Sequence, residues 1–550
     1  MRRPGGEHAQ RAGLSSTTLW FLVLTAALSV AAMAAGDVWQ TPQQRLELGI
    51  DYLCSQQVGA ALWDERYNPL AAQFPTAPLT FHWADEFTAE DGAEYNSRVA
   101  SQCPVAQVAP PGTQSAVALA VLFGGALAVY WLLPTWRIRR RGLVRLDRAG
   151  QPAELLRTVE QLAEGAGVSV RYLVNPLDER VSGVAFGHAG RRYIELKSGL
   201  LVLFKRDRAG FAAVVEHELG HVRNRDLDVS YLAVALWRTA VAMLLVAAVW
   251  FRENLGNEDE PFPPAVRYLV FMVLAAFLAR NGVLRTREYH ADAYAARTPE
   301  GAAALARLLG GDTGRRSPGW LAAVHPRGPD RVAVVAGQRR PPEFGRAGAA
   351  AFGLLAALAV PMLVDRGSWI LQVWAFQHRV IGWDAVSVRP AYVPLALIVL
   401  APVGAGLAVG IWRAVAHGPL RPALSWLGQL AACFGAGLLL GAWIAPQSTA
   451  LADPGLAASL GYDSLAALPL VGAGMVTALA VAAVSWRSAV GRPDSAGVAW
   501  MFAGYGAMSA TAGIAYGSAP GLGRMWWLVG VLAVFPLLGL LLSRVRRAGG

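Results

Sequence analysis

The chain alternates between long apolar runs and short polar segments rich in arginine. A run of about 20 apolar residues is long enough to cross a bilayer core, and such runs recur along the whole sequence. Ten candidates lie at roughly 19–35, 115–133, 229–251, 265–284, 347–364, 390–412, 423–445, 464–484, 497–517 and 524–543. The pattern predicts a mainly α-helical membrane protein with about ten transmembrane helices.

Composition supports this interpretation. The 550 residues are 54% hydrophobic and only 16% charged, which is typical of a polytopic membrane protein. The net charge of +11 is spread over clusters at the ends of apolar runs and does not form one patch. We therefore expect the lipid bilayer as the chain's environment and no nucleic acid as a partner.

The arginine clusters also predict sidedness. The second run is followed by "RIRRRGLVR" (137–145), which places that end in the cytoplasm. The acidic link "RENLGNEDEPFPP" (252–264) after the third run belongs outside. Both chain ends are then cytoplasmic, although one outer link also holds Arg366, Arg379 and Arg389. We take the first run as an uncleaved anchor, with a cleaved signal peptide as the alternative.

The segment between the first two runs, 37–113, is polar and Pro-rich and is expected outside the cell membrane. It holds Cys54 and Cys103, which we expect to form a disulfide there, two free thiols being the alternative.

Two soluble pieces flank the hairpin formed by the third and fourth runs. The first has a helical pattern at "PAELLRTVEQLAEGAG" and strand-like patterns at "VSVRYLV" and "RRYIELKSGLLVLF". Together the pieces predict one small cytoplasmic α+β domain interrupted by a transmembrane hairpin. We divide the chain into 1–36 (tail and first span), 37–113 (outer loop), 114–136 (second span), 137–228 and 285–345 (the α+β domain), 229–284 (hairpin) and 346–550 (six spans).

Candidate metal chemistry begins at "HELGH". His217 and His221 are four residues apart, so on a helix both imidazoles reach one ion. Glu218 is offset around the helix, where a carboxylate can take a proton from a metal-activated water. The motif alone is a moderate signal, since a charged helix face can carry the same residues.

A third ligand is expected from another helix on the same membrane side. "RTREYHADAYAAR" supplies Glu288 and Asp292, again four residues apart. One carboxylate can bind the metal while the other holds a ligand histidine by a hydrogen bond. His290 is a competing ligand, but it points off the face that the two carboxylates define.

The order "HELGHVRNRD", membrane hairpin, "REYHADAYA" and "HPRGPDR" resembles the integral-membrane zinc metallopeptidases that include HtpX and the CAAX prenyl proteases. The resemblance covers roughly 137–340. It implies a zincin-like protease domain with one Zn²⁺ per chain, Glu288 as third ligand and Asp292 as the residue behind a ligand. It further implies that His325 and Arg331 steady the oxyanion, and that Asn224 is structural.

The chain departs from that family's pattern in three places. The element before the catalytic helix reads "SGVAFGHAG", with Val184 where the family has asparagine. The outer loop and the six C-terminal spans have no counterpart in short HtpX-type members. The composition, rich in Ala, Gly and Arg, is bacterial and actinobacterial in character, which argues against prenylated substrates.

The leading interpretation is a zinc metalloendopeptidase in the cell membrane that cleaves polypeptides at its cytoplasmic face. Misfolded membrane or cytoplasmic-side proteins are the expected substrates, in quality control. One alternative is a signalling protease that cleaves a cytoplasmic repressor upon an external stimulus. Another is a non-catalytic scaffold or transporter with a degenerate protease domain. Against the last, every residue needed for peptide hydrolysis is present.

Overall fold

The computed structural model describes residues 16–38, 54, 57–62, 64–65, 89–103, 113–224, 226–255, 264–311, 325–337, 346–377, 385–417, 420–444, 467–487, 489–490, 496–517 and 534–544. Helices dominate, and one four-stranded sheet lies among them. The predicted apolar runs each coincide with a helix in this part of the chain.

Four helices form a bundle that leads to the sheet. They are α1 (Ser16–Val38), α6 (Thr113–Arg140), α10 (Asp226–Leu255) and α11 (Pro264–Ala295). The first of them, α1, packs against all three others, and Leu24, Ala27 and Leu28 on it are completely buried. Whether the first run is retained as an anchor stays a prediction.

The remaining long helices pack beside this bundle. They are α14 (Arg346–Gln377), α15 (Ala385–His417), α16 (Leu420–Ile444), α19 (Ala467–Arg487) and α20 (Ala496–Gly517), followed by an apolar helix at Val534–Arg544. Helices α14 and α16 cross closely, because a Cβ at Gly353 would lie 2.2 Å from the Phe434 carbonyl oxygen. Small residues at such crossings are typical of membrane helices.

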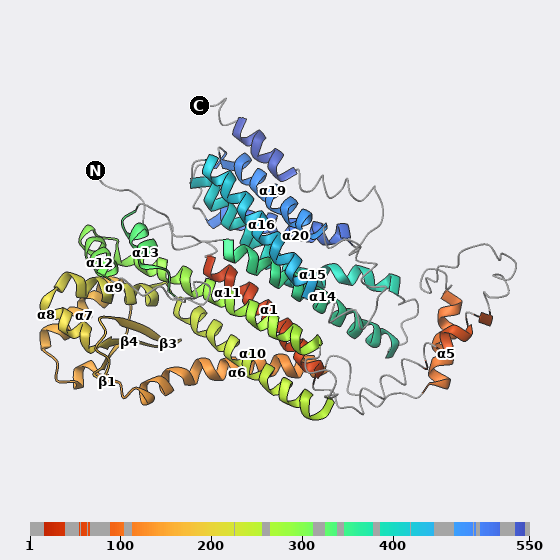
Figure 1. The fold of residues 1–550 in the computed structure, drawn as a ribbon, viewed down its shortest axis with the longest axis horizontal. Coiled ribbons are helices and arrows are strands. Elements are labelled where there is room, and N and C mark those ends of the chain that lie inside the picture. The colour runs from red at the N-terminus through yellow and green to blue at the C-terminus, as the bar shows by residue number, and fades with distance from the viewer. Residues whose placement is uncertain are drawn as a thin grey trace.

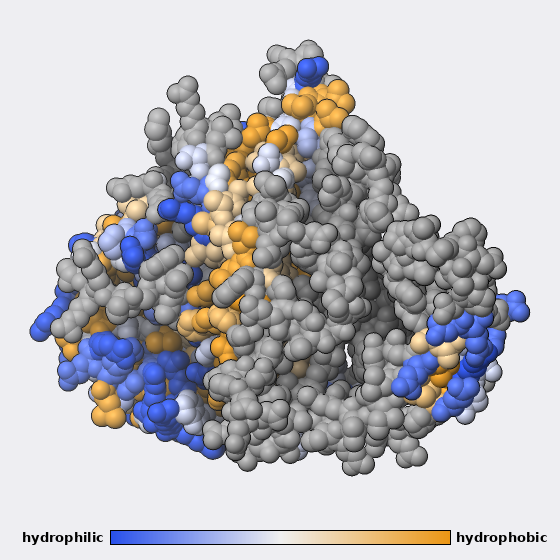
Figure 2. Space-filling model, turned by 45° about the vertical axis from the view of Figure 1, so that its right-hand side comes forward, coloured by the Kyte–Doolittle hydropathy of each residue, from blue (hydrophilic) through white to orange (hydrophobic). Residues whose placement is uncertain are grey.

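Four helices in the described part of the chain are long and apolar enough to cross a membrane: Thr113–Arg140, Leu227–Trp250, Leu269–Ala295 and Ser425–Ala442. On the face drawn in Figure 2, apolar side chains form a band beside a polar surface, as expected for a membrane protein. The count of about ten spans stays a prediction.

The sheet has the order β1-β2-β4-β3, from β1 (Val144–Arg145), β2 (Arg171–Asn175), β4 (Arg191–Lys197) and β3 (Gly183–His188). Strands β3 and β4 form an antiparallel hairpin, β2 and β4 are parallel, and β1 is antiparallel to β2. The "SGVAFGHAG" element thus forms β3, the edge strand next to β4. Strand β1 was not anticipated from the sequence.

Helices surround the sheet at one end of the bundle, as Figure 1 shows. They are α7 (Ala153–Ala166), α8 (Ser198–Arg206), α9 (Arg208–Arg223), α12 (Pro299–Gly311) and α13 (Gly328–Val335). Helix α7 matches its predicted segment and ends at Gly167, whose φ of 67° is left-handed, a conformation that glycine adopts at low cost.

One expectation about this domain was wrong. "RRYIELKSGLLVLF" was expected to be strand-like throughout, but only its first half is β4 and its second half is helix α8. Leu200 and Phe204, four residues apart, are both buried in the domain core, which is the spacing of a helix face. Short apolar runs do not distinguish the two structures by pattern alone.

The second candidate span is fastened to the sheet by a buried carboxylate. Glu195 on β4 has no solvent exposure and accepts hydrogen bonds from Arg137 (2.8 Å), Arg141 (3.2 Å) and Asn175 (2.8 Å). Burial acts to raise the pKa of Glu195, but Asn175 and Arg137 outweigh it and hold the pKa below its ordinary value. Two arginines of the basic cluster therefore also join the end of α6 to the α+β domain.

Helix α5 (Ala89–Gln102), in the segment between the first two candidate spans, lies away from the sheet, at the other end of the molecule (Figure 1). Beside this helix a disulfide joins Cys54 to Cys103, with a Cα–Cα distance of 5.7 Å. The disulfide predicted between these two cysteines is therefore present, while the sidedness of the two regions stays a prediction.

Candidate metal centre and active site

Helix α9 carries the His-Glu-His motif into the centre of the domain. Asp207 caps its first turn by accepting a hydrogen bond from the Gly210 amide at 2.9 Å. His217, Glu218 and His221 are 7%, 7% and 2% exposed. Phe211, Val215 and Leu219 anchor the helix in the domain core, so the motif is held on a rigid element.

The third element is the C-terminal end of α11, which continues from the hairpin without a break. It brings Glu288 to the two histidines: Glu288 oxygens lie 3.8 Å from His217 Nε2 and 3.5 Å from His221 Nε2. One ligand atom from each of the three residues lies within 4.8 Å of the others. Two imidazoles and a carboxylate at this spacing fit a divalent metal, and this donor set suits zinc.

Asp292, one turn beyond Glu288, lies behind the cluster. Its Oδ1 is 2.9 Å from His217 Nδ1, the contact expected to orient a ligand histidine. Arg331 on α13 binds the same carboxylate through two hydrogen bonds, at 2.7 Å and 2.6 Å. The chain His217–Asp292–Arg331 therefore links all three helices of the site.

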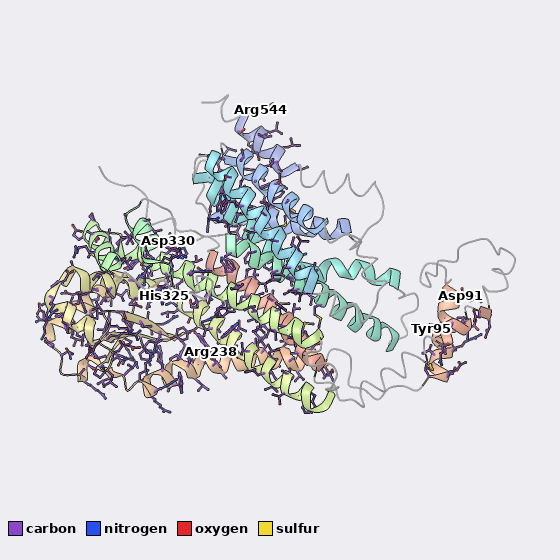
Figure 3. The ribbon with its side chains drawn as sticks, viewed as in Figure 1. Asp91, Tyr95, Arg238, His325, Asp330 and Arg544 are labelled. Carbon is purple, nitrogen blue, oxygen red and sulfur yellow. A yellow bond between two sulfur atoms is a disulfide. The ribbon has the colours of Figure 1, made fainter. Side chains whose placement is uncertain are left out.

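His325 precedes α13 and is labelled in Figure 3. Its Nδ1 lies 2.9 Å from Glu288 Oε2, while most of its side chain is exposed. The oxyanion role expected for His325 and Arg331 thus involves residues that also hold the two acidic side chains. Their role at the oxyanion stays a prediction.

Glu218 points to the edge strand and not to the other carboxylates. Its Oε2 accepts a hydrogen bond from the Ala185 amide at 2.6 Å. Gly183 makes room for it, since a Cβ there would lie 2.8 Å from Glu218 Cγ. Burial raises the pKa of the Glu218 carboxyl, which favours a group that accepts a proton near neutral pH.

Two further features of the site were not anticipated from the sequence. Gly220 lets α9 and α11 approach closely, because a Cβ there would lie 3.1 Å from Tyr294 Cβ. Arg287 donates from Nε to His221 Nδ1 at 2.9 Å. Burial and this guanidinium lower the pKa of His221 well below its ordinary value, which keeps the imidazole neutral as metal binding requires.

The Arg287 contact also restricts the tautomer of His221. With Nδ1 accepting a hydrogen bond, the proton of the neutral ring lies on Nε2. Coordination of a metal through Nε2 therefore requires Arg287 to release Nδ1.

The other predicted residues lie outside the cluster. Asn224 is the C-cap of α9, and its backbone N–H donates to the Gly220 carbonyl at 3.0 Å; the structural role of its side chain stays a prediction. His290, the competing ligand, is not part of the cluster of His217, His221 and Glu288. Val184 lies on β3 opposite Glu195 of β4.

Comparison with known proteins agrees with this geometry. Residues 150–338 match the model of Peptidase family M48. A protease HtpX homolog of Acidiphilium cryptum is 30% identical over 204 residues, 36% of this chain and 69% of the relative. The chain belongs to the M48 family. Two further relatives named protease HtpX homolog, from Desulfatibacillum aliphaticivorans and Salinibacter ruber, are each 29% identical to this chain, which covers 72% and 64% of their length.

The M48 match is confined to about a third of the chain and includes every residue of the cluster. Because M48 is a metallopeptidase family and the chain carries several apolar helices, the protein is a membrane metalloprotease. No solved structure matches the chain.

Proposed function

We propose that this protein is a zinc metalloendopeptidase that cleaves polypeptides at the cytoplasmic face of the cell membrane. The observation that carries the proposal is the convergence of His217, His221 and Glu288 with Glu218 beside them but engaged elsewhere. Three groups are thus available to a metal, and one carboxylate is left for proton transfer. That division of roles is the one peptide hydrolysis needs.

The chemistry follows from these positions. A bound zinc ion would supply a Lewis acid that makes water a competent nucleophile near neutral pH. Glu218 takes the proton of the attacking water and passes it to the leaving amine. The substrate lies along β3, where Ala185 already presents its amide outward to Glu218. His325 and Arg331 donate to the developing oxyanion.

The cytoplasmic location rests on charge and covalent structure at the two ends of the bundle. Arginines 137, 139 and 140 lie in the last turn of α6 beside the α+β domain, and Arg141 follows the helix, as the positive-inside rule expects. The disulfide in the outer segment requires an oxidising compartment. A protease facing the cytoplasm from the membrane fits quality control of misfolded membrane proteins, with partners that are polypeptides and not nucleic acid.

The test is cleavage of an unfolded soluble protein by the detergent-purified full chain supplied with zinc. The parent is compared with Glu218→Gln and with Glu160→Gln, which makes the same change at an exposed position on α7. We expect internal peptide bonds to be cut by the parent and by Glu160→Gln, and cleavage to fall at least 1,000-fold in Glu218→Gln, on the order of losses from removing a catalytic group. Equal cleavage by Glu218→Gln would refute the proposed role of this residue.

A further inference from the structure

A hollow of about 440 Å³ lies outside the catalytic site, where α6 meets the turn between β3 and β4. It is lined by Trp131 and Thr135 of α6 and by the consecutive residues 188–191 of the hairpin. His188 is the last residue of β3, and its ring packs on Trp131 with centroids 4.1 Å apart. Neither the proposed peptide hydrolysis nor the metal cluster uses this hollow.

The position of the hollow along α6 places it at the membrane surface. Lipid-facing residues of this helix include Leu127 and Leu132, which are 52% and 66% exposed. Trp131 and Trp136 are also exposed, and three arginines follow in the last turn. Exposed tryptophans between an apolar stretch and a basic one mark the level of lipid headgroups.

The charges around the hollow favour an anion. Arg191 is exposed and forms no ion pair with any residue in the described part of the chain. No acidic residue lines the hollow. The carboxylate of Asp228 lies near the hollow, where one oxygen accepts a hydrogen bond from the Tyr130 hydroxyl at 2.6 Å. Its other oxygen is paired with Arg192, so the charge of Asp228 is already compensated.

We propose that this hollow binds the phosphate group of an anionic phospholipid. Arg191 pairs with the phosphate, the Thr135 hydroxyl donates to it, and Trp131 packs against the glycerol and upper acyl carbons. Bare phosphate is excluded as the natural ligand by the exposed apolar helix face that continues from the hollow into the bilayer. A lipid bound there also contacts the turn that ends β3, the strand that holds Glu218.

The turn is already fastened to the span. The Ala189 amide donates to the Tyr130 hydroxyl at 2.7 Å. Ala189 lies four residues after Ala185, whose amide donates a hydrogen bond to Glu218. The site is therefore formed by the fold without a ligand and does not require movement of α6. This makes binding measurable independently of peptidase activity.

The experiment is native mass spectrometry of the detergent-purified full chain titrated with phosphatidylglycerol, and separately with phosphatidylcholine. We expect Arg191→Gln to weaken phosphatidylglycerol binding about tenfold and Thr135→Val about threefold, as loss of a charged and a neutral hydrogen bond predicts. Arg191→Lys, which keeps the charge, should stay within about threefold of the parent. The matched control is Arg157→Gln, at an exposed arginine of α7.

Three results would overturn the proposal. One is phosphatidylglycerol binding that is equal in the parent and Arg191→Gln. Another is an equal loss in Arg157→Gln, because binding would then follow only the net charge of the basic domain. The third is a parent that binds phosphatidylcholine as tightly as phosphatidylglycerol, since a site for anionic lipid discriminates between them. The readout is lipid binding, so it is unaffected by whether the chain cleaves peptides.

Discussion

Replacing Gly183 by alanine tests whether the placement of Glu218 matters for catalysis. The added Cβ would lie 2.8 Å from Glu218 Cγ, whereas ordinary contacts begin at 3.4 Å. The side chain must therefore shift by about 0.6 Å, and displacements near 1 Å cost catalytic groups about 100-fold. We expect kcat/KM to fall between about 10-fold and 100-fold, which corresponds to about 1.4 to 2.7 kcal/mol of transition-state stabilisation.

The metal should remain, because Glu218 is not one of the three ligands. The assay is therefore cleavage of an unfolded protein together with zinc content, measured in the parent, Gly183→Ala and Gly165→Ala. Gly165 lies on α7 with nothing within 4 Å of its added Cβ, so it controls for the chemical change. Full activity in Gly183→Ala would refute the reasoning that the edge strand positions Glu218.

Three further changes probe the scaffold of the site. Gly220→Val should remove both zinc and activity, because the valine side chain would push Tyr294 and Ala291 and so move α11, with Glu288, away from α9. Unchanged zinc content in this variant would show that the helix crossing does not set the ligand spacing. Asp292→Asn should weaken zinc about 10-fold to 100-fold in a chelator competition, since it removes the charge that holds His217 and Arg331, and an unaltered affinity would contradict this role. Glu195→Gln should lower the free energy of unfolding of the protease domain by about 3 kcal/mol, because it leaves the partly buried Arg137 unpaired. The pKa of Glu195 is lowered by folding, so its contribution is present above its unfolded pKa and is lost as the pH falls through the folded value. The difference between parent and Glu195→Gln in denaturant unfolding should therefore shrink at acidic pH, and a difference independent of pH would contradict the assignment.

The features that could be predicted from the sequence are those that depend on residues close together along the chain. Apolar runs predict helices because a helix that spans a membrane needs them continuously. The i, i+4 spacings of His217 with His221 and of Glu288 with Asp292 place each pair on one face of its helix. The two pairs were predicted to form one site because the hairpin returns α11 beside α9, and the two helices do pack together.

The contacts between distant segments could not be read in the same way. Ala185 and Glu218 are 33 residues apart, and the bond between them depends on how β3 lies against α9. Arg137 was interpreted through its place after an apolar run, whereas its ion pair with Glu195 spans 58 residues. The helix α8 was missed because a short apolar segment satisfies both a strand and a helix until its neighbours are known.

The central claim is that Glu218 and Glu288 have different roles: Glu288 binds the metal and Glu218 moves the proton. The most direct measurement is zinc stoichiometry and cleavage for the parent, Glu218→Gln and Glu288→Gln, purified under identical conditions. The account predicts about one zinc per chain in the parent and in Glu218→Gln, with cleavage only in the parent, and loss of zinc from Glu288→Gln. Zinc retained equally by Glu288→Gln, or lost from Glu218→Gln, would contradict it.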